Sequence, residues 1–142
     1  MVEKFVIDAS VGAKWFFKEE SQDLSLNFYH RLRVKEIGLI VPDLFYVEMS
    51  NICWQRCRRR MINHNQADSI LEEIMSVPFE GYSDKEFADV AFENAVRFGI
   101  SVYDGVYIAL AEACVVPLVT ADEKLLKATK GSFDFILPLR EH

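Results

Sequence analysis

The chain has 142 residues, of which 51% are hydrophobic, and its formal net charge at pH 7 is −6. This length suits one compact domain, and the composition excludes a disordered, repetitive or collagen-like protein. The acidic balance argues against a generic nucleic-acid-coating protein, because binding to phosphates is usually driven by a basic surface. We therefore expect residues 1–142 to form a single folded domain.

The N-terminus and the cysteines indicate the compartment. The N-terminus runs directly into a strand-like segment without the apolar core of a signal peptide, and no apolar run approaches the roughly 18 residues of a membrane helix. The three cysteines are an odd number without a disulfide-like framework. A zinc site at Cys53, Cys57 and His64 would lack a fourth ligand. We expect a cytoplasmic protein with reduced thiols and no membrane association.

Hydrophobic patterning predicts strands that alternate with helices along the chain. Strands are expected at residues 4–8, 38–42, 77–82, 115–120 and 133–137. Helices are expected at residues 11–18, 21–35, 43–60, 65–76, 84–98, 104–114 and 122–130. Asp43 and Asp84 are expected to cap the helices that they begin, and Gly99 to end one. This alternation predicts an α/β fold with a mainly parallel sheet between two layers of helices.

Four acidic residues fall at one edge of this predicted sheet. Asp8 ends the first strand, and Glu48 lies in the second turn of the helix after the second strand. Asp104 begins a helix, and Asp122 follows the fourth strand. The carboxyl ends of parallel strands and the starts of the following helices share an edge, so the four side chains are expected to converge. Other roles remain open: helix caps for Asp104 and Asp122, a solvated turn for Asp8, and a polar helix face for Glu48.

A convergence of carboxylates is a candidate metal site, because their mutual repulsion raises their energy unless cations bind among them. Ligands that are all oxygen suit hard ions such as Mg²⁺ or Mn²⁺, which keep water and accept phosphate oxygens. Such an ion can turn a bound water into a nucleophile and stabilise the leaving oxygen of a phosphodiester. The acidic residues therefore indicate metal-dependent phosphodiester hydrolysis.

Four segments resemble the motifs of PIN domains, especially those of the VapC-type toxins of prokaryotic toxin–antitoxin pairs. The segments are 6–11 with 14–16 behind it, 42–51, 103–111 and 118–125. Their order, spacing and predicted local structure match the family over nearly the whole chain. One departure is Gly105, which stands where an alanine is more usual, a change that loosens the helix start but removes no ligand.

The resemblance implies a three-layer α/β/α fold with a five-stranded parallel sheet, and a metal-dependent ribonuclease that leaves a 5′-phosphate. Asp8, Asp104 and Asp122 would hold the principal Mg²⁺ or Mn²⁺ ion, and Glu48 would position the water or help to hold a second ion. A homodimer is also implied, as is a cognate antitoxin partner that lies across the active-site groove and silences the enzyme.

The resemblance also points to two hydroxyl groups and an RNA-binding segment. Ser10 and Thr120 match positions whose hydroxyls shape the site in many members, although a serine after an aspartate is also a common helix cap. A run of arginines follows at the end of helix 43–60. Arg56 and Arg60 are expected to share a helix face with Arg59 adjacent, and their guanidinium groups suit phosphate oxygens of RNA. A solvated helix end is the alternative interpretation.

Three other classes compete with a nuclease. A haloacid-dehalogenase-like phosphatase requires a second aspartate two residues after the first, where this chain has Ser10. A receiver domain requires paired acids at its first strand and a phosphoacceptor after its third, and neither is clear here. A PIN fold that binds RNA or a protein partner with little or no nuclease activity is disfavoured, because all four acids are present.

Overall fold

The computed structural model describes residues 2–140. The strands are β1 (Glu3–Ile7), β2 (Ile37–Pro42), β3 (Glu80–Tyr82), β4 (Leu118–Thr120) and β5 (Ile136–Pro138). The α-helices are α1 (Ala9–Ala13), α2 (Gln22–Arg33), α3 (Leu44–Arg58), α4 (His64–Ser76), α5 (Ala88–Phe98), α6 (Val102–Cys114) and α7 (Glu123–Thr129). A short 3-10 helix, η1 (Asp84–Glu86), precedes α5.

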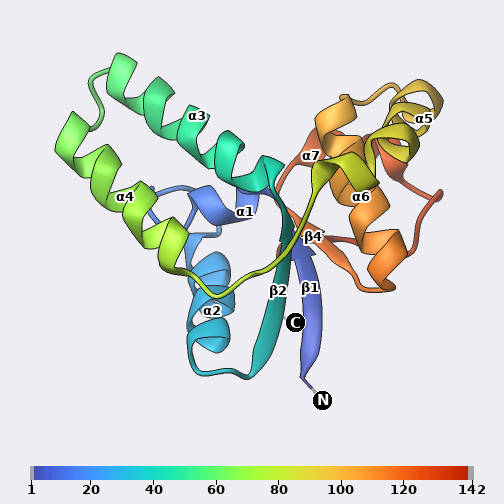
Figure 1. The fold of residues 1–142 in the computed structure, drawn as a ribbon, viewed down its shortest axis with the longest axis horizontal. Coiled ribbons are helices and arrows are strands. Elements are labelled where there is room, and N and C mark those ends of the chain that lie inside the picture. Colours follow the sequence, from blue (N-terminus) through green and yellow to red (C-terminus); the bar gives the residue numbers. More distant parts are fainter. Residues whose placement is uncertain (1, 141–142) are drawn as a thin grey trace.

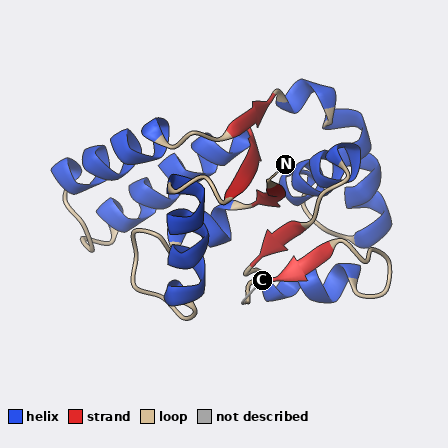
Figure 2. Cartoon of the chain, turned by 90° about the horizontal axis from the view of Figure 1, so that it is seen from below, coloured by secondary structure: helices blue, strands red, loops and turns tan. Residues whose placement is uncertain are grey.

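The five strands form one parallel sheet in the order β3-β2-β1-β4-β5. Helices α1 to α4 lie on one side of this sheet and α5 to α7 on the other (Figure 1), and the strands run between the two groups of helices (Figure 2). This arrangement confirms the expected three-layer α/β/α fold. The strand order reverses between β1 and β4, and such a reversal opens a crevice at the carboxyl ends of the strands.

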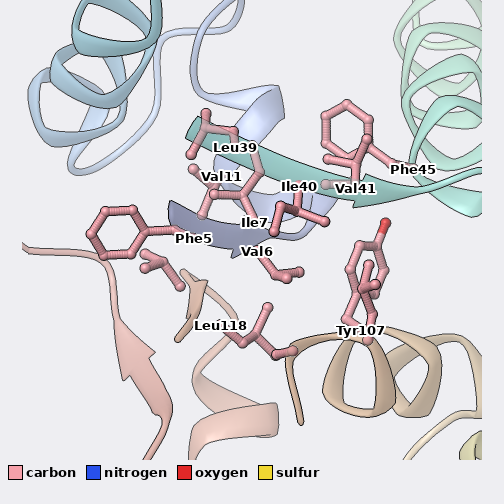
Figure 3. Packing of buried hydrophobic residues seen from close by; sticks show 14 of the residues in the cluster. Phe5, Val6, Ile7, Val11, Leu39, Ile40, Val41, Phe45, Tyr107 and Leu118 are labelled. Atoms are coloured by element: carbon pink, nitrogen blue, oxygen red, sulfur yellow. The ribbon is translucent and has the colours of Figure 1, made fainter. Parts of the chain in front are cut away.

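The main core fills the space between the sheet and its helices. Val6 and Ile7 of β1 and Leu39 and Ile40 of β2 are almost completely buried, and Figure 3 shows them packed together with Tyr107 of α6. Helices cover both faces of the sheet, so residues 5–7 of β1 and 39–42 of β2 form continuous apolar runs without a polar side. A second, smaller core lies where α1, α3 and α4 meet; its buried members are Ala13, Phe17, Cys53 and Ala67.

Several predicted elements are shorter in the structure; the strands expected at 77–82 and 133–137 are reduced to Glu80–Tyr82 and Ile136–Pro138. The helix expected at 11–18 ends at Ala13, and the chain then turns so that Trp15 Nε1 donates to Ser25 O at 2.9 Å. The strand expected at 115–120 begins at Leu118, because Val115 has a left-handed conformation (φ 56°) and ends α6. Within residues 2–140, no helix is long and apolar enough to cross a membrane.

The cap of α3 comes from a distant residue. Asp43 makes no side-chain capping hydrogen bond, so the prediction that it caps this helix is wrong. Instead, Leu44 N donates to Asp84 Oδ1 at 3.0 Å, across 40 positions of sequence. Asp84 in turn begins η1 and not a long helix, and Ser83 caps that short element. This contact joins the start of α3, which carries Glu48, to the segment after β3.

Candidate active site

Asp8 is the most firmly held of the predicted acids. It is 5% exposed and caps α1, with Oδ1 accepting from Ser10 N at 3.1 Å and from Val11 N at 3.4 Å. Two hydroxyls also donate to it: Ser10 Oγ to Oδ1 at 2.5 Å, and Thr120 Oγ1 to Oδ2 at 2.5 Å. Both carboxylate oxygens therefore have fixed positions.

The same hydroxyls connect Asp8 to the segment after β4. Ser10 Oγ accepts from Ala121 N at 2.9 Å, and Thr120 Oγ1 accepts from Asp122 N at 3.0 Å. Asp122 caps α7 with its own carboxylate, which accepts two backbone N–H groups. The structure thus places Asp8, Ser10, Thr120 and Asp122 in one hydrogen-bonded group at the point where the strand order reverses. The capping role expected as an alternative for Asp122 is also present.

Glu48 is held by a residue that sequence reasoning missed. Tyr107 OH donates to Glu48 Oε1 at 2.6 Å and so joins α6 to α3. Tyr107 is 1% exposed, and in Figure 3 its ring lies among the buried apolar side chains with its hydroxyl pointing away from α6. In the sequence it lies in the apolar run 106–111 and resembles an ordinary core residue. Only its position three residues after Asp104 could have drawn attention to it.

Asp104 does not cap α6, so that explanation for its presence is wrong. The helix begins at Val102, and Ser101 is its cap, with Ser101 Oγ accepting from Asp104 N at 3.0 Å. The Asp104 carboxylate is partly exposed and is free of the capping role. It is therefore available for a ligand.

Gly105 is needed where α5 and α6 cross. A Cβ atom built on Gly105 would lie 2.5 Å from Ala91 O and 3.0 Å from Ala91 Cα. Backbone atoms cannot move aside as the end of a flexible side chain can. The expectation that glycine loosens the start of this helix is therefore wrong: glycine allows close packing there, next to Asp104.

Burial and mutual repulsion raise the pKa values of three of the acids. Burial raises the pKa of Asp8 from 3.8 to about 6; its hydrogen bonds with Ser10 and Thr120 oppose this rise, and the charge of Asp104 adds to it. The pKa of Glu48 is raised first by burial and then by Asp8 and Asp104, while the hydrogen bond from Tyr107 lowers it. The pKa of Asp104 is raised by burial and then by Asp122. Asp104 therefore interacts electrostatically with each of the other three acids.

These residues fit a hard divalent cation by their chemistry. The donors are all oxygen, and a cation among them would relieve both the burial of charge and the repulsion. Within residues 2–140, however, no three carboxylate, imidazole or thiol groups lie close enough to form a ready-made metal cluster. The acids therefore repel one another through Asp104 but do not form a closed metal cage.

The arginine run is divided by the end of α3. Arg56 and Arg59 line a cavity of about 300 Å³ beside the Asp8 group, whereas Arg58 stacks on Trp54, with its Cζ 4.6 Å from the ring centroid. Arg60 lies beyond the helix in a left-handed conformation (φ 59°). The expectation that Arg56 and Arg60 share a helix face is therefore wrong, because α3 ends at Arg58.

Comparison with known proteins gives matches along most of the chain. The model of the PIN domain family matches residues 5–131. Ribonuclease VapC3 of Pyrobaculum aerophilum is 32% identical over 125 residues, which cover 86% of this chain and 92% of the relative. Ribonuclease VapC12 of Mycobacterium tuberculosis is 31% identical over 87 residues, which cover 61% of this chain and 66% of the relative.

Solved structures agree with this fold. The protein PAE2754 of Pyrobaculum aerophilum has a TM-score of 0.69 at 25% identity, covering 97% of this chain and 84% of that one. VapC20 of Mycobacterium tuberculosis, described as a toxin that cleaves the sarcin-ricin loop, has a TM-score of 0.67 at 14% identity, covering 94% and 99%. A toxin–antitoxin complex from Klebsiella pneumoniae contains a chain with a TM-score of 0.65 at 12% identity, covering 96% and 98%. The last two are similar in fold alone.

Proposed function

The chain belongs to the PIN domain family, and we propose that it is a divalent-metal-dependent endoribonuclease with an acidic site formed by Asp8, Glu48, Asp104 and Asp122. One observation carries the proposal: near the point where the strand order reverses, burial and then repulsion between acids raise the pKa of the buried Asp8 and of the partly buried Glu48 and Asp104. That arrangement costs free energy in the absence of a cation. The two relatives named as VapC ribonucleases support the reaction class.

Asp8, Asp104 and Asp122 are the residues that would hold Mg²⁺ or Mn²⁺, with Glu48 beside them. When bound, the cation supplies an activated water and stabilises the charge that develops on the leaving oxygen. Glu48 Oε1 is occupied by Tyr107, and Oε2 accepts no hydrogen bond from residues 2–140. In our proposal Oε2 orients the attacking water by accepting its hydrogen bond.

The hydroxyls of Ser10 and Thr120 would keep Asp8 in one orientation. Each donates to a different oxygen of the Asp8 carboxylate, and each also accepts a backbone N–H from the segment after β4. Such hydrogen bonds around a ligating carboxylate normally tune the affinity for the metal. In our proposal Arg56, Arg59 and Arg60 bind phosphates of the RNA backbone, and the cavity beside Arg56 and Arg59 supports this role for those two.

We further propose that residues 1–142 act as one PIN domain, the toxin of a toxin–antitoxin pair, which forms a homodimer in the cytoplasm. Val47 and Tyr103 are 65% and 62% exposed, and both line a cavity of about 390 Å³ that also contains Glu48. Exposed apolar side chains around a polar site are typical of a surface that a partner covers. The similar chain in a toxin–antitoxin complex supports an antitoxin as that partner.

The proposal is tested by RNA cleavage with the purified protein in Mg²⁺, in Mn²⁺ and with chelator. A circular RNA is included, because it has no ends and only an endonuclease can cut it. We expect metal-dependent cleavage that falls by about 10³-fold in Asp104→Asn, which corresponds to ~4 kcal/mol of lost transition-state stabilisation. Asp134→Asn is the matched control. Asp134 is exposed on the loop before β5, at the amino ends of the parallel strands and not at the carboxyl ends, and the variant should cleave like the wild type.

Two results would overturn the proposal. Cleavage that survives Asp104→Asn unchanged would indicate a contaminating nuclease. A folded protein that binds Mn²⁺ but cuts no RNA in either metal would indicate the binding module instead.

A further inference from the structure

The cavity of about 300 Å³ beside the acidic site carries an unusual arrangement of charges. Ser10, whose hydroxyl bonds Asp8, forms part of its wall, so the cavity is continuous with the acidic group. Lys14, Glu19 and Arg56 also line it. Arg59 lines it as well, so in this chain of net charge −6 three cationic residues line one cavity beside the carboxylates, and two of them, Lys14 and Arg56, flank Glu19.

Both cations are positioned by contacts other than their ion pairs. Lys14 is 9% exposed, and its Nζ donates to Glu20 O at 2.5 Å. The guanidinium of Arg56 stacks on Phe17, with its Cζ 4.5 Å from the ring centroid. The two groups are therefore fixed in the wall of the cavity, as a preorganised anion site requires.

Glu19 lies between these cations but is bound loosely. Its Oε1 is 3.8 Å from Lys14 Nζ, and its Oε2 is 3.5 Å from Arg56 Nη2. Both distances exceed the roughly 2.7–2.9 Å of a strong charge-assisted hydrogen bond. Glu19 belongs to the irregular segment between α1 and α2, and its side chain is 33% exposed. It can therefore leave the cavity without disrupting a helix.

We propose that this cavity binds a backbone phosphate of the RNA strand next to the scissile position, and that Glu19 occupies it as an internal competitor in the free protein. The inference rests on the proposed ribonuclease function. A phosphodiester presents two charged oxygens, as the Glu19 carboxylate does, and can replace it between Lys14 and Arg56. Because Ser10 touches both sites, a strand with one phosphate at Asp8 continues directly into the cavity.

The first test measures how tightly a fluorescently labelled single-stranded oligoribonucleotide binds, with chelator present to prevent cleavage. Glu19→Gln removes the competitor while keeping the shape, and we expect binding to tighten about two- to fivefold, the range of a partly exposed ion pair. Glu36→Gln removes the same charge beside Arg31, at the start of β2 and far from the cavity, and should leave the affinity unchanged.

A second pair of variants tests whether the gain acts through the cavity. Arg56→Gln should weaken binding and reduce the slope of log K against log [KCl] by about one. Arg58→Gln, whose guanidinium stacks on Trp54 outside the cavity, should do neither. In the Arg56→Gln background, Glu19→Gln should increase the affinity for RNA less than it does in the wild type. There Glu19 has lost Arg56 as an ion-pair partner and competes with the phosphate only for Lys14.

The outcomes separate this inference from the proposed function. If the wild type cleaves RNA but Glu19→Gln binds no more tightly, or if Glu36→Gln brings the same gain, the phosphate subsite is wrong and the ribonuclease stands. A gain from Glu19→Gln that is undiminished in the Arg56→Gln background likewise overturns the subsite. If the wild type neither binds nor cleaves RNA, both proposals fail together.

Discussion

The two halves of the acidic site are built in different ways. Asp8 and Asp122 follow β1 and β4, which are neighbours in the sheet, and Thr120 connects them by hydrogen bonds. Glu48 and Asp104 lie on helices α3 and α6, on opposite sides of the sheet (Figure 1), and Tyr107 holds only Glu48. Asp8 and Asp122, the sheet half, are fixed by backbone pairing of β1 with β4. Glu48 and Asp104, the helix half, depend on how α3 and α6 pack against the sheet.

This difference indicates how the site would assemble. In our proposal the sheet half is the preorganised part of a cation site, because Asp8 is buried and two hydroxyls hold its carboxylate. Within residues 2–140 the acids form no ready-made metal cluster, so Glu48 and Asp104 would have to turn towards a bound ion to complete the site. Variants of single residues can separate the contributions of the two halves.

The largest expected effect on stability concerns pH in the metal-free protein. The folded-state pKa of Asp8 lies above its unfolded value, so the stability that it contributes is present below about pH 4 and is lost as pH rises through about 6. A rise from 3.8 to about 6 corresponds to up to about 3 kcal/mol. We expect denaturant unfolding in chelator to show lower stability at pH 7.5 than at pH 5, and Mn²⁺ to restore it at pH 7.5.

Asp8→Asn provides the control for this prediction, because it cannot ionise at position 8. Its unfolding free energy should depend less on pH over the same interval, and Mn²⁺ should stabilise it less. If the pH dependence of the unfolding free energy is unchanged in Asp8→Asn, the loss of stability comes from another group, for example Glu48 or Asp104, whose pKa values are also raised.

The next effect concerns the helix half. Gly105→Ala forces a Cβ against the backbone of Ala91, and we expect a loss of about 2 kcal/mol in unfolding free energy, within the range for overpacking. Cleavage should fall as well, because a shift of α6 moves Asp104. Gly81→Ala is the matched control, since a Cβ there meets no atom within 4 Å. Equal losses in the two variants would mean that the helix crossing is not what requires glycine.

Gly105 also shows what the sequence could and could not predict. The strand ends and the convergence at Asp8 and Asp122 follow from apolar runs and parallel pairing, which are local patterns with one simple geometry. Gly105 and Tyr107 act through partners on other helices, Ala91 and Glu48, so no local pattern reveals them.

The same limit explains the errors at helix ends. Asp43, Asp84 and Asp104 are all good capping residues, and the sequence does not tell which will be used. Asp84 reaches Leu44 only because β3 pairs beside β2, while Ser101 displaces Asp104 by starting its helix two residues earlier than expected. Tertiary pairing therefore decides among local choices of similar energy.

Thr120→Val tests the sheet half at nearly constant shape. It removes the hydroxyl that donates to Asp8 and accepts from Asp122 N, in a side chain with no exposed surface. We expect cleavage to fall by about 10–100-fold, as is usual for partners of metal ligands. Thr120→Ser keeps the hydroxyl and should retain most of the activity. If Thr120→Ser loses as much activity as Thr120→Val, loss of the hydroxyl alone does not explain the effect.

Tyr107→Phe should have the smallest effect on cleavage, about tenfold or less, because Glu48 is partly exposed and water can replace the lost hydrogen bond. The change should appear in kcat more than in KM, since Tyr107 touches Glu48 and not the substrate. The hydrogen bond lowers the pKa of Glu48, so its loss raises that pKa and moves the acidic limb of the pH–rate profile to higher pH. A lower rate with an unmoved profile would mean that Tyr107 supports only the packing of α6 and that the helix half is positioned by other contacts.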